Sequence, residues 1–223
     1  RFYVALAHTD NFAVDSAGDG AERISLTHLL PEKLNEHLLF SLSFDSGIHY
    51  RAFSSHRLFH HTLAPPKPRG MFADCGAYQY RKLDNPIHED GTDVSADSVW
   101  GIYFDRHVNS DYAWEEILLC APDHIVTKDM SNSDTRQRLM FTQEHAGRFL
   151  ELARAHPNVH PVGVIHGRTN EERMEQYNFF KELGYTHVAL GGMVPYSRYQ
   201  RQVLHIVAGI VDLNVPLIAK NSI

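Results

Sequence analysis

The amino-acid sequence predicts an α/β fold, a (β/α)8 TIM barrel that is incomplete at the C-terminus of this chain. Apolar, β-branched runs of strand length recur along the chain and alternate with segments of helical period. The runs are nearly continuous in hydrophobicity, as expected for strands covered on both faces. Polar residues and glycines follow several of them, at the strand ends where barrel enzymes assemble their sites. Periodicity alone leaves an open doubly wound sheet as the alternative.

Seven segments have the composition of strands and are bounded by turn residues. They are 1–8, 38–44, 70–74, 124–129, 160–167, 186–192 and 216–220. The chain starts without Met in the first of these segments and stops shortly after the last. We therefore expect a fragment.

Three helices are expected between and after these strands. The best defined follows segment 160–167, because Thr169 and Glu172 have the spacing of a capping box and Gly184 can end the helix. A second is predicted from about Asp134 to His156, and a third begins near Tyr196. Strand, loop, helix and strand thus follow each other as in a parallel sheet.

Composition indicates one globular domain over residues 1–223. Of the 223 residues, 43% are hydrophobic and 22% are charged, and irregular insertions are expected near 54–69 and 85–97. No apolar stretch approaches the roughly 18 residues of a membrane span, so a cytoplasmic protein without a membrane partner is expected. Cys75 and Cys120 are too few for a disulfide scaffold. The net charge of −6 argues against a uniformly basic surface, although a local patch can still hold phosphates.

Asp74 is the first candidate for chemistry. It ends the segment 70–74 and precedes Cys75, Gly76 and Ala77, whose small side chains let a ligand or backbone approach closely. A pocket carboxylate is one reading, and a residue that caps a turn through its side-chain oxygen is the other.

Further candidates lie at three other predicted strand ends. Asp129 ends segment 124–129, where its carboxylate can bind the amidine edge of a guanine-like base, or can instead be a capping acid beside Lys128. Asp123 is at the entry of that segment, so the two acids are not expected to act together. His166, Gly167 and Arg168 offer an imidazole, a permissive backbone and a guanidinium for phosphate, and Gly191 and Gly192 offer backbone N–H groups.

A catalytic metal is not expected. His56, His60 and His61 include an i, i+4 pair, but the segment is irregular, HExxH is absent and no acidic third ligand is obvious.

Four of these segments together resemble the tRNA-guanine transglycosylases. FADCGAYQY resembles the DSGGFQ or DSGSFQ segment of that family, DHIVTKD its aspartate-bounded strand, and VIHGR its VQGG segment. ALGGMVPYSRY is similar to the GG(L/V)VP segment, especially that of the archaeal-type enzymes and their DNA-modifying relatives. The order is the same, and the resemblance covers about residues 69–223.

The resemblance implies a barrel enzyme that exchanges guanine in tRNA or DNA for a 7-deazaguanine base, such as 7-cyano-7-deazaguanine, through a covalent intermediate. The target nucleotide would be flipped out, so nucleic acid and the free base are the expected partners, besides a homodimer or partner subunit. Asp74 would be the acid/base and base-contacting carboxylate, and Asp129 would bind the guanine-like edge. His166, Gly167, Gly191, Gly192 and Met193 would line the base pocket, with Arg168 as a phosphate-binding candidate.

The chain departs from the family pattern at several positions. His166 and Arg168 replace the Gln and second Gly of the usual segment, and Ala77 and Tyr78 replace Gly or Ser and Phe. The family's nucleophilic aspartate and its structural zinc segment would lie beyond residue 223, so no cofactor is expected within this chain. Two alternatives remain open: a non-catalytic partner subunit of such an enzyme, and a metal-dependent barrel hydrolase.

Overall fold

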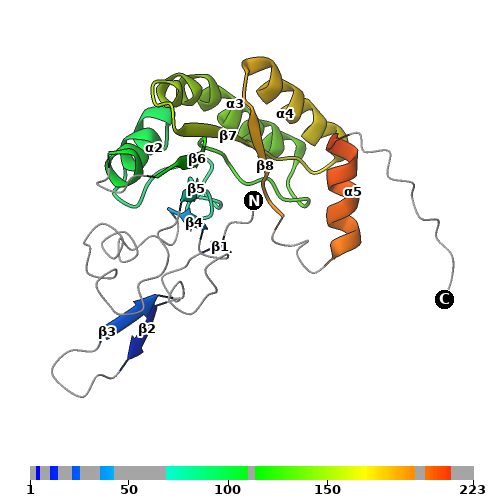
Figure 1. Cartoon of the computed structure of the whole chain (residues 1–223). Coiled ribbons are helices and arrows are strands. Elements are labelled where there is room, and N and C mark those ends of the chain that lie inside the picture. Colours follow the sequence, from blue (N-terminus) through cyan, green and yellow to red (C-terminus); the bar gives the residue numbers. More distant parts are fainter. Residues whose placement is uncertain are drawn as a thin grey trace, which may run out of the picture.

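A computed structural model describes residues 4–5, 11–14, 22–25, 36–42, 69–109, 114–193 and 199–211. Six strands form one parallel sheet in the order β1-β4-β5-β6-β7-β8 (Figure 1). A separate antiparallel pair consists of β2 and β3. The strands are β1 Val4–Ala5, β2 Asn11–Val14, β3 Glu22–Ser25, β4 His37–Ser41, β5 Gly70–Asp74, β6 Glu116–Cys120, β7 Val159–Ile165 and β8 His187–Leu190.

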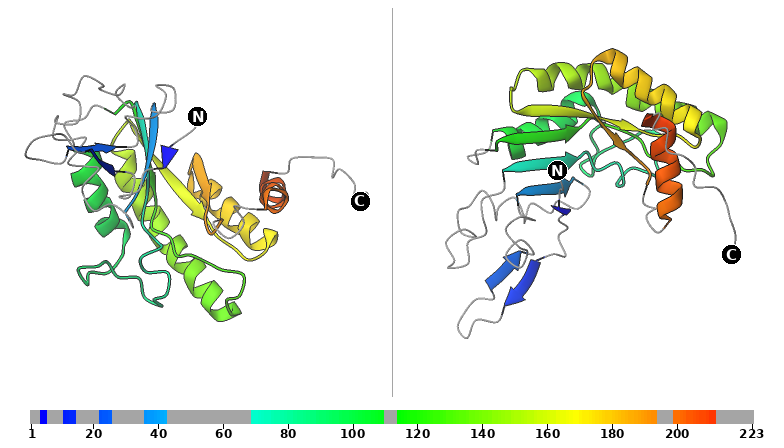
Figure 2. Two further views of the ribbon diagram at one scale, coloured as in Figure 1. Left: turned by 90° about the horizontal axis from the view of Figure 1, so that it is seen from below. Right: turned by 45° about the vertical axis from the view of Figure 1, so that its right-hand side comes forward.

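The strand order follows the chain without a reversal, which is the pattern of a singly wound barrel rather than of a doubly wound sheet. Right-handed crossovers that all move in one direction place their helices on the same face. Helices α2, α3 and α4 cover one face of the sheet, and the sheet curls away from them (Figures 1 and 2). The predicted α/β class and parallel sheet are confirmed, in the form of a curled half-barrel. The helices are α2 Ala96–Tyr103, α3 Asn132–Arg154, α4 Asn170–Leu183 and α5 Gln200–Val211, and a π-helical turn, Phe104–Val108, extends α2.

Helix α4 begins and ends where its sequence predicts. The Thr169 hydroxyl accepts a hydrogen bond from the backbone N–H of Glu172, and Gly184 takes the left-handed conformation, φ 99°, that ends the helix. The helix packs directly on β7, because a Cβ atom at Gly163 would lie 2.5 Å from Cδ1 of the buried Phe180. This contact holds the C-terminal half of α4 against the middle of β7.

The core lies between the sheet and the helices α2, α3 and α4. Tyr103 of α2 and Phe149 of α3 are fully buried and meet edge to face, with ring centroids 6.1 Å apart. Helix α3 is 23 residues long and starts at Ser131, whose hydroxyl accepts from the N–H of Asp134. Residues of the strands that complete this core are Met71, Ala73, Ile117, Leu119, Val159 and Ile165.

The strand predicted at 124–129 is wrong. The strand is Glu116–Cys120, and Pro122 follows it closely. Residues 121–127 are irregular, and side chains hold their backbone: the Arg138 guanidinium donates to the carbonyl of Ile125, and the N–H of His124 donates to the Thr142 hydroxyl. The β-branched composition of this segment predicts a strand, but side chains of α3 bind its backbone instead.

Other differences are smaller. Helix α2 and the β2–β3 pair were not predicted, and the helix expected to begin near Tyr196 begins at Gln200. Residues 85–95 form turns and one isolated bridge, whereas Ala96 and Asp97, which the sequence places in the same irregular segment, begin α2. Segments 54–68 and 216–220 lie outside the described residues. Within the part of the chain that the structure describes, no helix combines the length and apolarity needed to cross a membrane.

Candidate functional site

Asp74 lies at the carboxyl end of β5, where the sequence places it. Ser41 is its partner in the register of the neighbouring strand β4, and the Ser41 hydroxyl donates to Asp74 Oδ2 at 2.6 Å. The same oxygen accepts from the N–H of Gly76 at 3.2 Å. Asp74 is therefore a strand-end carboxylate that stabilises the turn after β5 through its side-chain oxygen, which is the second of its two readings.

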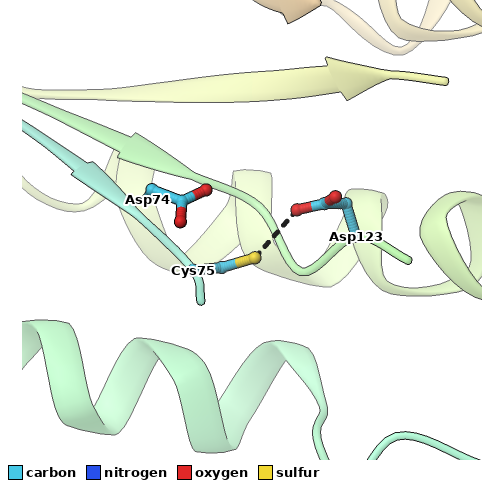
Figure 3. Close-up of side chains that lie close together, drawn as sticks. All are labelled: Asp74, Cys75 and Asp123. Atoms are coloured by element: carbon cyan, nitrogen blue, oxygen red, sulfur yellow. Dashed lines mark hydrogen bonds between the residues drawn. The ribbon is translucent and has the colours of Figure 1, made fainter. Parts of the chain in front are cut away.

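Asp123 is the second carboxylate of the site and lies three residues beyond β6. Its side chain is 3% exposed and has a partner on each oxygen. Cys75 Sγ donates to Oδ1 at 2.8 Å, and His166 Nε2 lies 2.6 Å from Oδ2. Figure 3 shows Cys75 and Asp123 directed toward each other, with the Asp74 carboxylate beside them. The loop after β6 thus joins the ends of β5 and β7.

Buried hydrogen bonds fasten the two loops that carry these groups. The Tyr80 hydroxyl donates to the carbonyl of Asp123 at 3.0 Å. The Arg138 guanidinium donates both to the carbonyl of Arg81 and to that of Ile125, and His124 Nε2 lies 2.8 Å from the carbonyl of Leu83. Because each contact connects the loop after β5 to that after β6 or to α3, the site is held in place before any ligand binds.

His166 lies at the end of β7 and is packed against the end of β8. A Cβ atom at Gly191 would lie 2.8 Å from His166 Nδ1 and closer still to Cε1 and Nε2, so only glycine leaves room for the ring. His166 is 1% exposed, and its Nδ1 has no hydrogen-bond partner. In the Asp123–His166 pair, His166 Nδ1 is therefore the imidazole nitrogen without a hydrogen bond, and it lies next to Gly191 and Gly192.

Electrostatics in this cluster favour the protonated forms of Asp74 and Cys75. Burial raises the pKa of Asp74, the negative charge of Asp123 raises it further, and the hydrogen bond from Ser41 opposes both. Burial, followed by the charges of Asp123 and Asp74, raises the pKa of the Cys75 thiol well above its ordinary value. The thiol is therefore a hydrogen-bond donor at neutral pH and not a nucleophile.

Asp74, Cys75 and Asp123 also have the geometry of a metal site, since one ligand atom of each lies within 4.8 Å of the others. A metal ion would need the Cys75 thiolate, and it would have to displace the thiol proton that is hydrogen-bonded to Asp123. His56, His60 and His61 lie outside the described residues. The cluster is thus better suited to hydrogen bonding and proton transfer than to holding a metal.

The other predicted site residues are placed as follows. Asp129 is exposed in a turn nine residues after β6, while Asp123 occupies the position beside Asp74. The Gly191 N–H donates to the carbonyl of Ile165, so it is not open to a ligand. Gly192 has φ 67° and, like Met193, is half-buried.

Gly167 and Arg168 connect β7 to α4. Gly167 lies against the first turn of α4, where a Cβ atom would come within 2.9 Å of the backbone nitrogen of Arg173. The Arg168 guanidinium is bound by Glu172 at 2.7 Å and by the carbonyl of Met130 at 3.1 Å. Its positive charge is therefore already matched within the protein.

No protein-family model matches this chain, and no curated protein matches it significantly. The resemblance to transglycosylases therefore rests on the four motifs, and the site must be judged by its own geometry.

Sequence reasoning missed Asp123 as a member of the site because it assigned the strand to the wrong segment. A signal was available: the apolar run 117–121 ends in Pro122, and Asp123 follows directly, as Asp74 follows its own strand. The roles of Ser41 and Tyr80 depend on register and loop contacts, for which the sequence carries no comparable signal.

Proposed function

We propose that this protein is a base-exchange glycosyltransferase that replaces guanine in tRNA or DNA with a 7-deazaguanine base such as 7-cyano-7-deazaguanine. One observation carries the proposal: the carboxylates of Asp74 and Asp123 and the imidazole of His166 meet at three neighbouring strand ends. Such groups can bind the polar edge of a guanine-like base and give a proton to its leaving nitrogen. The order and spacing of the transglycosylase-like motifs support it. The complete fold is proposed to be a (β/α)8 barrel.

Asp74 is assigned as the acid/base and base-contacting group. Burial and the negative charge of Asp123 raise its pKa, which favours the protonated carboxyl that can donate to the departing base nitrogen. Ser41 and Gly76 fix the position of one Asp74 oxygen and leave the other to a ligand. In this proposal Asp74 moves the proton. The glycosyl group passes from the departing guanine to a nucleophilic carboxylate, which the resemblance to transglycosylases implies beyond residue 223, and from there to the incoming base.

Asp123 takes over the base-binding role that the sequence assigns to Asp129. A carboxylate has about four acceptor positions, and Cys75 and His166 use two of them. The remaining two can accept a pair of N–H bonds from the amidine edge of guanine. His166 Nδ1 supplies a further polar contact beside Gly192 and Met193, which line the same pocket in this proposal.

The test is exchange of labelled guanine by the complete protein, with tRNA and duplex DNA as parallel acceptors and 7-cyano-7-deazaguanine as the incoming base. We expect release of labelled guanine from one acceptor without strand cleavage. The Asp74→Asn variant should lower that rate by on the order of a hundredfold or more, because acid/base help is lost. An unchanged rate in the variant would overturn the role of Asp74. Base binding without exchange would instead support the non-catalytic partner subunit.

A further inference from the structure

A cavity of about 500 Å³ lies between the first turn of α4 and the first turns of α5, outside the carboxylate cluster. The two helices lie side by side at the β8 end of the sheet (Figures 1 and 2). Arg168, which lines the cavity, is two residues after His166 of the carboxylate cluster. The cavity and the cluster therefore lie at the same carboxyl edge of the sheet. The residues that line it are Arg168, Thr169, Asn170, Glu171, Arg173, Arg201, Gln202, His205 and Ile206.

Arg173 is the unusual member of this lining. It is 6% exposed, and its guanidinium has one hydrogen bond, from Nη1 to the neutral amide oxygen of Asn170 at 3.3 Å. None of the ion pairs among the described residues involves Arg173, Arg201 or His205. The Arg173 guanidinium therefore lines an open cavity and has no anionic partner among the described residues, which leaves it able to bind an anion there.

The charges around the cavity agree with an anion. Glu172 neutralises Arg168, which leaves Arg173 and Arg201 against the exposed Glu171. Three arginines and two glutamates give one net positive charge before His205 is counted. The N-terminus of α4, whose residues Asn170 and Glu171 line the cavity, adds its dipole.

We infer that this cavity binds a backbone phosphate of the nucleic-acid substrate, next to the nucleotide whose base enters the carboxylate cluster. The substrate class rests on the proposed function, whereas the anion site rests on the cavity and its unpaired guanidinium groups. Arg173 and Arg201 thereby take the role that the sequence assigns to Arg168. A phosphate held at this edge would fix the strand while its base is turned into the site.

The experiment measures binding of a fluorescein-labelled single-stranded oligonucleotide by fluorescence anisotropy between 50 and 200 mM NaCl, using the complete protein. Arg201→Ala is chosen because the side chain is exposed and its loss should not unfold the protein. Loss of one phosphate contact should make the slope of log K against log salt less steep by about 0.7. Between 50 and 200 mM NaCl the affinity of both proteins should fall, and the factor by which it falls should be about 2.5 times smaller for Arg201→Ala than for the wild type.

Two further variants control for charge. Glu171→Gln removes the one carboxylate that lines the cavity and should tighten binding. Arg154→Ala removes the same charge as Arg201→Ala from an exposed position at the opposite edge, where α3 ends, and should bind as the wild type does. Wild-type affinity and slope in Arg201→Ala, or an equal loss in Arg154→Ala, would overturn the inference.

The outcomes separate this inference from the proposed function. Guanine exchange with an unaltered salt slope in Arg201→Ala refutes the phosphate site and leaves the exchange activity standing. A reduced slope in a protein that exchanges no base supports the phosphate site and refutes the exchange activity.

Discussion

The contact between Gly191 and His166 offers the sharpest test of how the site is built. In Gly191→Ala, the new methyl group would overlap the imidazole, which is 1% exposed. The ring must shift, and the 2.6 Å contact with Asp123 must break. A hydrogen bond to a charged group contributes about 1.5–3 kcal/mol, and forcing a methyl group into a packed site costs about 1–3 kcal/mol. We expect a loss of about 3–5 kcal/mol in the free energy of unfolding.

The assay is urea unfolding at pH 7, followed by far-UV circular dichroism. Gly147→Ala is the matched control, because Gly147 lies within α3 and a Cβ atom there would meet nothing within 4 Å. That variant should gain about 0.5–1 kcal/mol from the same chemical change. Placing Gly191→Ala in a His166→Ala background should remove most of its effect, since the overlapping ring is gone. A Gly191→Ala protein as stable as the wild type would refute the packing of His166 on β8.

Three further predictions concern single groups. The pKa of Asp74 is raised above its ordinary 3.8 in the folded protein, so ionisation of Asp74 destabilises the fold as pH rises through the folded pKa. Asp74→Asn should therefore unfold at a higher urea concentration than the wild type at pH 7. The difference between the two urea midpoints should shrink toward pH 4. The Cys75 thiol, buried and with its pKa well above the ordinary value, should react with a thiol reagent far more slowly in the folded protein than in urea; equal rates would contradict its burial. Thr169→Ala should lower the free energy of unfolding by about 1 kcal/mol by removing the cap of α4, and an unchanged urea midpoint would show that the cap is not needed.

The sequence predicted those parts of the fold whose signals are local. Helix α4 has its cap at Thr169 and its end at Gly184, and both can be read from residue type and spacing. Asp74 follows an apolar run that can only be a short buried strand, and β5 ends there. In each case the local preference and the tertiary contacts agree.

The site could be predicted only in part, because long-range contacts complete it. Asp123 joins the site because the register places the end of β6 beside β5. Its partners Cys75 and His166 lie 48 residues earlier and 43 residues later in the chain. Segment 124–129 has the composition of a strand, but Arg138 and Thr142 hold its backbone against α3. The β-strand propensity of this segment is overridden by these side-chain hydrogen bonds, which no local sequence pattern indicates.

The central claim is that the buried cluster around Asp123, and not the exposed Asp129, holds the guanine-like base. Equilibrium dialysis of labelled guanine against the wild type, Asp123→Asn and Asp129→Asn tests it directly. A carboxylate that accepts two N–H bonds contributes about 1.5–3 kcal/mol, so Asp123→Asn should weaken binding by about tenfold or more, and Asp129→Asn should bind as the wild type does. Wild-type affinity in Asp123→Asn together with lost affinity in Asp129→Asn would contradict the claim.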